Sequence, residues 1–173
     1  MNTKNIIDLL SKAGCVRKGN FTLKSGKVID SYFDLRLLTA HPKALKKIVQ
    51  GLVLLAQKID YEAVIAIPIG GISLATGFSL LTGKPMGYVR KYPKKYGCMK
   101  WVEGVDIKPF QKILLFDDLI GSGGSSLKAL RILRGKGAIV KDLVVVVDRR
   151  EDPKKSFAGV KVHSLLNCKN SYV

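Results

Sequence analysis

Short apolar runs alternate with longer stretches of helical periodicity along most of the chain. Runs of Val, Ile, Leu and Ala at 63–67, 112–116 and 143–147 have the length of strands and little polar alternation, which is typical of strands buried on both faces. Residues 85–89 and 160–165 match two further strands, the second at an edge. The pattern predicts an α/β fold with a central, mostly parallel sheet flanked by helices.

Helices are predicted between these strands. Pro42 suits a first helical turn, and Leu74–Leu81 and Ser125–Arg134 carry later helices, the first of them ending before Gly83. The helix after Pro42 has apolar residues at helical spacing: Leu45, Ile48, Val49, Leu52 and Leu55. Because ligands bind beyond the carboxyl ends of parallel strands, we expect the chemistry at that edge of the sheet.

The N-terminal region has a weaker pattern. Thr3 or Asn5 is the expected cap of a helix that runs through Ala13 and closes at Gly14. Short extended segments are expected at 21–23 and 31–35, and a long polar loop at 91–104.

Composition narrows the possible partners. The 173 residues suit a single domain, and a 47% hydrophobic content excludes disorder. Thirty basic residues against 13 acidic ones give a net charge of +17, which attracts nucleic acid, anionic membrane surfaces or phosphorylated small molecules. The three cysteines are widely spaced, and no run reaches the length of a membrane span, so we expect a reduced, cytoplasmic protein without a disulfide framework or zinc site.

The strongest chemical signal is Ile113–Ser126, ILLFDDLIGSGGSS. A buried strand ends in the acidic pair Asp117 and Asp118, and a loop of small residues at 121–125 leads into a helix. Backbone N–H groups at a helix start, reached through glycines and flanked by serine hydroxyls, suit a phosphate. The loop lacks the GK[ST] of a Walker motif, and Ser126 replaces the last glycine of a dinucleotide fingerprint. A plain turn is the alternative, but it leaves the acidic pair unexplained.

Residues 116–125 resemble the phosphoribosyl pyrophosphate (PRPP) motif of type I phosphoribosyltransferases. In that family the acidic pair meets the ribose 2′- and 3′-hydroxyls and the loop holds the 5′-phosphate. Four more segments resemble the orotate phosphoribosyltransferases within it. They are the N-terminal hood (21–37), the pyrophosphate loop (65–75), the catalytic loop (88–104) and the orotate-facing strand end (146–151).

The resemblance implies one phosphoribosyltransferase domain, with a hood over 1–40 and a core over 41–173 that includes a mobile loop at 91–104. It implies transfer of ribose 5-phosphate from PRPP to orotate, giving orotidine 5′-monophosphate and pyrophosphate in pyrimidine nucleotide biosynthesis. The implied catalytic residues are Lys94, Asp117 and Asp118. The implied PRPP contacts are Lys24, Ile69, Gly70, Gly71, Arg90, Lys91, Lys94, Lys95, Tyr96, Asp117, Asp118, Gly121, Ser122, Gly123, Gly124 and Ser125. The implied orotate contacts are Lys24, Phe33, Gly121 and Arg149.

The catalytic loop also implies an assembly and a metal. By resemblance, Lys94 reaches the neighbouring subunit's site, so a homodimer is expected. Mg²⁺ is expected on PRPP oxygens, near Asp117 and Asp118 but without direct protein ligands.

Non-functional roles stay open for some of these residues. The loop lysines are alternatively a solvated run of charge, and Arg149 alternatively forms a salt bridge to Asp148 or Glu151. His41 and His163 are expected at surface or cap positions, and Trp101 in packing.

The sequence departs from the family at several positions. Tyr96 replaces the usual loop histidine and cannot carry positive charge at neutral pH. Gly121 replaces a threonine that commonly meets orotate, Cys98 and Met99 replace small loop residues, and Ile29-Asp30 stands where proline is common. These changes leave a different base as an alternative substrate.

Charge leaves a second alternative open. Residues 84–104 carry a net +5 and residues 17–36 a net +3, so about half of the +17 lies in segments expected around PRPP. The remaining positive charge lies outside these two segments, and no motif accounts for it. It favours a PRPP-sensing regulator that binds nucleic acid, although no nucleic-acid-binding motif is present.

Overall fold

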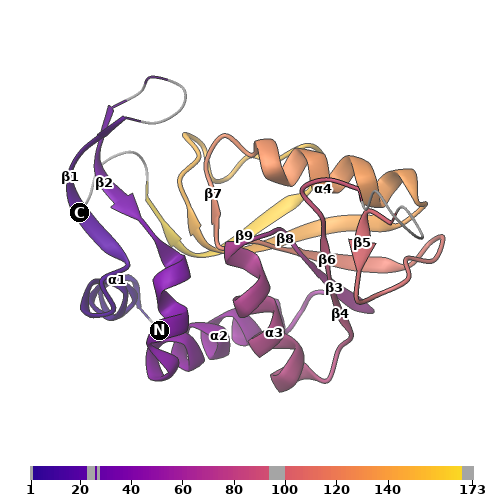
Figure 1. Cartoon of the computed structure of the whole chain (residues 1–173), viewed down its shortest axis with the longest axis horizontal. Helices are drawn as coiled ribbons and strands as arrows, with labels where there is room; N and C mark the ends of the chain where they lie inside the picture. The colour runs from indigo at the N-terminus through magenta and orange to yellow at the C-terminus, as the bar shows by residue number, and fades with distance from the viewer. Residues whose placement is uncertain (1, 23–25, 27, 94–99, 169–173) are drawn as a thin grey trace.

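The computed structural model describes residues 2–22, 26, 28–93 and 100–168 (Figure 1). Within these residues seven strands form one central sheet. Five of them lie side by side and run parallel: β4 (Met86–Val89), β3 (Ala63–Ala66), β6 (Lys112–Phe116), β8 (Ile139–Asp148) and β9 (Lys161–Asn167). The predicted mostly parallel sheet is confirmed.

Two short strands complete the sheet. β5 (Val102–Glu103) is antiparallel to β4 at one edge, and β7 (Leu119–Ile120) runs parallel to the last residues of β8. Neither is predicted from the sequence, because a two-residue strand has no periodicity of its own. β9 pairs with β8 at the other edge, as expected.

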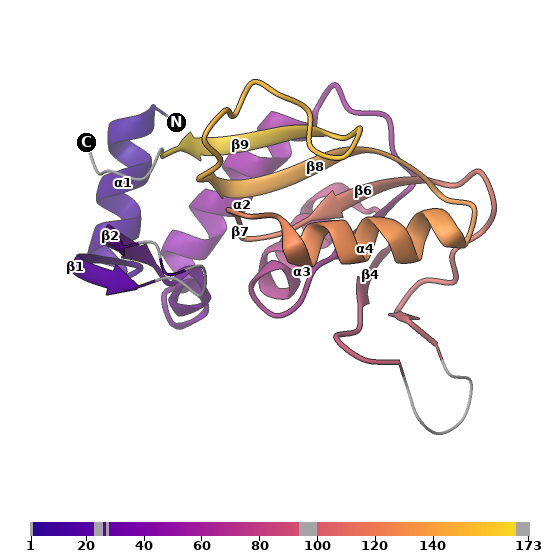
Figure 2. The same cartoon turned by 90° about the horizontal axis from the view of Figure 1, so that it is seen from above.

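Helices cover both faces of the sheet (Figures 1 and 2). Alternate strand residues point to opposite faces, so Val64 and Leu114 pack with the first three helices while Ile65 and Leu115 pack with the fourth. The helices are α1 (Thr3–Lys12), α2 (Pro42–Ala56), α3 (Gly70–Thr82) and α4 (Gly124–Gly135). No helix of the described ranges is long and apolar enough to cross a lipid bilayer.

The N-terminal region differs in detail from expectation. The cap of α1 is Asn2, whose side chain accepts a hydrogen bond of 2.9 Å from the N–H of Asn5, and not Thr3 or Asn5. The cap lies one residue earlier because Thr3 already belongs to the helix. Gly14 follows the helix with φ +67°, as a closing glycine should.

A hairpin forms the rest of the hood. β1 (Val16–Thr22) pairs antiparallel with β2 (Val28–Phe33), and a 3₁₀ helix, η1 (Leu35–Ala40), follows. The predicted extended segments at 21–23 and 31–35 therefore start too late, and Leu35 is helical. Most of β1 is exposed, so its residues show no apolar alternation from which to predict a strand.

Candidate functional site

Loops that follow four strands meet at the carboxyl edge of the sheet. β3 and β6 lie side by side there, and the N–H of Ile67 donates to the carbonyl of Phe116 over 2.8 Å. This contact sets the predicted pyrophosphate loop directly beside the acidic pair. Because β3 and β6 are neighbouring parallel strands, the pyrophosphate loop and the acidic pair lie together although they are about fifty residues apart in the sequence.

The acidic pair is held by its own backbone. Asp117 is 6% exposed, and its Oδ1 accepts a hydrogen bond of 2.9 Å from the N–H of Asp118. Asp118 is half-buried and accepts from the N–H of Leu119 over 2.9 Å. Burial, and then the charge of Asp118, raise the pKa of the Asp117 carboxyl well above its usual value. Adjacent carboxylates in this setting suit hydroxyl hydrogen bonds, in which either protonation state of Asp117 has a role.

The pyrophosphate loop approaches this pair as closely as glycine allows. A Cβ on Gly70 would lie 1.9 Å from Oδ2 of Asp118, and one on Gly71 would lie 2.8 Å from the carbonyl oxygen of Phe116. Both glycines are buried, whereas Ile69 is 76% exposed at the rim. The two glycines are therefore required for the loop to lie against Asp118.

The phosphate loop leads into α4 as predicted. Gly123 precedes the helix with φ +75°, and a Cβ there would lie 2.3 Å from the ring of Phe157. Among the residues that the structure describes, no side chain caps the helix start, so its first N–H groups are available to an anion. The remaining small residues of the loop are exposed or half-buried: Gly121, Ser122, Gly124 and Ser125.

Arg149 joins the hood to the core. Its Nη1 donates to the carbonyl of Ser31 over 3.0 Å, and its guanidinium lies 5.7 Å from the ring centroid of Phe33. The salt bridge considered for Arg149 with Asp148 does not form, because Asp148 pairs with Arg150 over 2.8 Å. Arg149 and Phe33 thus lie together at the strand end, and their contact with orotate stays a prediction. Ser31 is a contact that sequence reasoning missed.

The stems of the catalytic loop form a short ladder. The N–H of Arg90 donates to the carbonyl of Trp101 over 2.8 Å, and the Arg90 guanidinium pairs with Glu103 over 3.0 Å. Lys91 is exposed, with its Nζ 5.5 Å from the ring centroid of Tyr92. The sequence also missed Lys128 of α4, whose Nζ lies 5.2 Å from the ring centroid of Trp101.

Several predicted site residues lie outside the described residues. They are Lys24, Lys94, Lys95 and Tyr96, together with the departures Cys98 and Met99. Their roles stay predictions.

The described residues include no cluster of three or more His, Cys, Asp and Glu side chains able to hold a metal ion. The donors at the site are the carboxylates of Asp117 and Asp118. Mg²⁺ is commonly bound by one or two carboxylates together with substrate phosphates and water, so this donor set fits a magnesium ion that arrives with its substrate.

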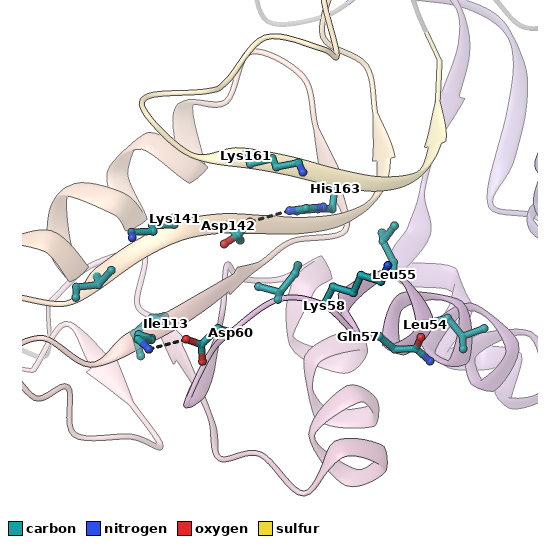
Figure 3. Close-up of a pocket in the computed structure, with 13 residues that line it drawn as sticks. Leu54, Leu55, Gln57, Lys58, Asp60, Ile113, Lys141, Asp142, Lys161 and His163 are labelled. Carbon is teal, nitrogen blue, oxygen red and sulfur yellow. Dashed lines mark hydrogen bonds and ion pairs between the residues drawn. The ribbon is translucent and has the colours of Figure 1, made fainter.

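A separate cavity of about 570 Å³ lies at the opposite edge of the sheet, at the amino ends of β6, β8 and β9 (Figure 3). His163 and Asp142 pair across 2.7 Å within it. Lys58, Lys141 and Lys161 come from different segments around it, and a fourth lining lysine, Lys112, is paired with Asp60. His163 is thus half-buried with its Nε2 beside the Asp142 carboxylate, and His41 precedes α2 at the cap position.

Comparison with known proteins agrees with the site geometry. Residues 36–171 match the phosphoribosyl transferase domain family. The chain is 36% identical to the orotate phosphoribosyltransferase of Pyrococcus abyssi over 94% of this chain and 91% of that one. It is 38% identical to the enzyme of that name from Methanocaldococcus jannaschii, over 87% and 85% of the two chains.

Solved structures give the same picture. The crystal structure of the Aeropyrum pernix orotate phosphoribosyltransferase matches with a TM-score of 0.77 and 27% identity, over 94% of this chain and 93% of that one. The Mycobacterium tuberculosis enzyme in complex with PRPP matches with a TM-score of 0.75 and 26% identity, over 94% of each chain. Given this fold, this strand-end site and these relatives, the chain belongs to the orotate phosphoribosyltransferase family.

Proposed function

We propose that the protein transfers ribose 5-phosphate from PRPP to orotate, releasing pyrophosphate and forming orotidine 5′-monophosphate for pyrimidine nucleotide biosynthesis. One observation carries the proposal: the acidic pair, the phosphate loop and Arg149 share one edge of the sheet, in a chain of the orotate phosphoribosyltransferase family. A relative solved with PRPP has the same fold.

Different residues of the core bind different parts of PRPP. Asp117 and Asp118 accept hydrogen bonds from the ribose hydroxyls, and the N–H groups of Gly124 and Ser125 bind the 5′-phosphate at the start of α4. Gly70 and Gly71 let the backbone approach the pyrophosphate. This arrangement orients C1′ of the ribose toward the hood.

Arg149 binds the base. A guanidinium pairs with a carboxylate in two parallel hydrogen bonds, and orotate differs from uracil by such a carboxylate. The bond from Nη1 to Ser31 holds the group in place, and the ring of Phe33 lies beneath it. Gly121, with open space where a side chain would stand, leaves room for the base.

Charge on the leaving pyrophosphate is stabilised by cations from the loop. Arg90 and Lys91 stand at its outgoing stem, and Lys94 and Lys95 follow in the sequence. The transition state is oxocarbenium-like, so such cations act where negative charge develops. Magnesium bound to PRPP would neutralise further charge on the same group.

A homodimer with shared sites is part of the proposal. α3 exposes Leu80 and Leu81, of which Leu80 is 81% exposed, and Ile69 is exposed beside the site. Apolar surface of this kind is what a second copy would cover. Light scattering should give twice the mass of the 173-residue chain; a monomer at assay concentrations would refute this part.

The decisive experiment is pyrophosphate release from PRPP and Mg²⁺ with a panel of bases: orotate, uracil, adenine and hypoxanthine. We expect release with orotate alone. Arg149→Met should raise the KM for orotate about 10- to 100-fold, because a charged hydrogen bond contributes about 1.5–3 kcal/mol. Arg131→Met, which removes an exposed arginine of α4, is the matched control. Release with another base, or an unchanged KM in Arg149→Met, would contradict the assignment.

A PRPP-responsive regulator is the second candidate, favoured by the part of the +17 charge that lies outside the site. It requires DNA or RNA binding that weakens steeply with salt. Absence of binding at low salt would exclude it.

A further inference from the structure

Lys128 lies one helical turn beyond the phosphate loop. It follows Gly124, the first residue of α4, by four positions, so the two share a face of the helix. The Cα–Cβ bond of a helical residue leans toward the helix N-terminus, which for Lys128 is the end where the phosphate loop enters α4. Lys128 belongs to none of the motifs, although its helix begins at the phosphate loop.

The Lys128 ammonium contacts both stems of the catalytic loop. It donates a hydrogen bond to the carbonyl of Lys91 and lies 5.6 Å from the ring centroid of Tyr92, on the outgoing stem. It also lies 5.2 Å from the ring centroid of Trp101, on the returning stem. Both ring distances fall within the roughly 6 Å range of cation–π contacts.

These contacts begin where the stem ladder ends. β4 and β5 pair through Tyr88–Glu103 and Val89–Val102, and the hydrogen bond from Arg90 to Trp101 follows as the last rung. Lys128 joins α4 to Lys91 and Tyr92, which follow this rung on the outgoing stem, and to Trp101, which forms it on the returning stem. A lysine among so many cations is repelled by them, so its placement depends on the carbonyl and the two ring faces that attract it.

A second basic residue of α4, Arg131, does not share the contacts of Lys128. Arg131 stands three residues further along α4 and is exposed. Within the described part of the chain its side chain makes no hydrogen bond, ion pair or ring contact. A general solvated basic face would not distinguish the two residues.

We infer that Lys128 is a positioning residue for phosphoribosyl transfer. Its ammonium connects α4, the helix that begins at the phosphate loop, to both stems of the catalytic loop. It thereby fixes the positions of Arg90 and Lys91, on the outgoing stem, relative to PRPP. This role rests on the proposed function. It implies a coupling between 5′-phosphate binding and the placement of the cations that face pyrophosphate.

Lys128→Met tests the inference, because methionine keeps an apolar stem and removes the charge. We expect kcat to fall about 10- to 100-fold, the effect of misplacing catalytic groups by about an ångström, with the KM for orotate unchanged within about twofold. Lys128→Arg should restore most of the activity, since a guanidinium also stacks on aromatic rings. Arg131→Met, with the same loss of charge on α4, should match the wild type.

Trp101 provides a readout that needs no turnover, because it is the single tryptophan of the chain. Without the Lys128 ammonium the two stems are no longer held against α4, so acrylamide should reach the Trp101 ring and quench its fluorescence more strongly in Lys128→Met than in the wild type or Arg131→Met. Thermal melting should be the same in all three, since Lys128 is exposed.

The two readouts separate the inference from the function. Wild-type activity and wild-type quenching in Lys128→Met would overturn the role of Lys128. Equal losses of kcat in Lys128→Met and Arg131→Met would overturn it too, because general charge would then be the cause. A changed quenching together with no orotate-dependent turnover in the wild type would refute the proposed function and leave the stem contact standing.

Discussion

Replacing Gly70 by alanine should disable the acidic pair without changing any charge. The added methyl group would lie 1.9 Å from Oδ2 and 2.2 Å from Cγ of Asp118. The carboxylate must retreat by about 1.5 Å to reach an ordinary contact of 3.4 Å. Gly70 does not have a positive φ, so the effect is steric and not a matter of backbone strain.

The displacement predicts the size of the kinetic effect. Misplacing a catalytic group by about 1 Å costs on the order of 100-fold in rate, or about 2.7 kcal/mol of transition-state stabilisation. We therefore expect kcat/KM for PRPP to fall about 100-fold. The KM for orotate should stay within about twofold, because Arg149 is held by Ser31 and not by Asp118.

The assay is steady-state pyrophosphate release at varied PRPP, with thermal melting to establish that the variant folds. Overpacking a buried site costs about 1–3 kcal/mol of stability, so a lower but cooperative melt is expected. Gly135→Ala, where a Cβ meets nothing within 4 Å, is the matched control and should keep full activity. A folded Gly70→Ala protein with wild-type kcat/KM would refute the role given to Asp118.

Three further predictions concern protonation, backbone and thiol chemistry. Asp117→Asn should stabilise the fold at neutral pH while removing activity, because the raised pKa means that burial of the charged carboxylate opposes folding. The wild type recovers that stability as pH falls through the raised folded pKa and has it fully below 3.8, so urea unfolding at neutral pH and at about pH 3.5 should show the gain only at the higher pH. Gly123→Ala should lose about 1–3 kcal/mol of stability and raise the KM for PRPP, since φ is +75° and the methyl would meet Phe157; an unchanged melting temperature would contradict this. Burial, and then the charge of Asp34, raise the pKa of the Cys15 thiol to about 11, so iodoacetamide at about pH 8 should label Cys15 only after unfolding, as peptide mapping would reveal.

The core of the fold is readable from the sequence because its strands are buried on both faces. β3 and β6 consist largely of consecutive apolar residues over the length of a strand, as expected for strands of a parallel sheet covered on both faces. The hood is not readable in the same way. β1 exposes Arg17–Asn20, and its extended conformation is stabilised by pairing with β2. This pairing joins two segments, so the hydrophobic pattern of β1 alone does not predict it.

The candidate site likewise contains residues that a local stretch of sequence predicts and residues that only contacts between separate elements bring together. The acidic pair and the glycine-rich loop are local: Asp117–Ser125 is one stretch of chain, and its chemistry follows from residue types and spacing. Arg149 and Phe33, which the resemblance places at the orotate site, lie close to each other in the structure, and their contact with orotate stays a prediction. For the acidic pair and the loop, residue types and spacing along one stretch of chain carry the prediction.

Contacts across the sheet required the tertiary structure. The Gly70 backbone lies against Asp118 because β3 and β6 are neighbours, and Arg149 reaches Ser31 across 118 positions of sequence. Lys128 meets Tyr92 and Trp101 only because α4 packs beside the stems of another loop. Sequence by itself determined which chemical groups are present and which strands are buried, since burial leaves a pattern of apolar residues. The tertiary structure decided which groups act on one another, since distances between separate elements depend on packing that no local stretch of the chain encodes.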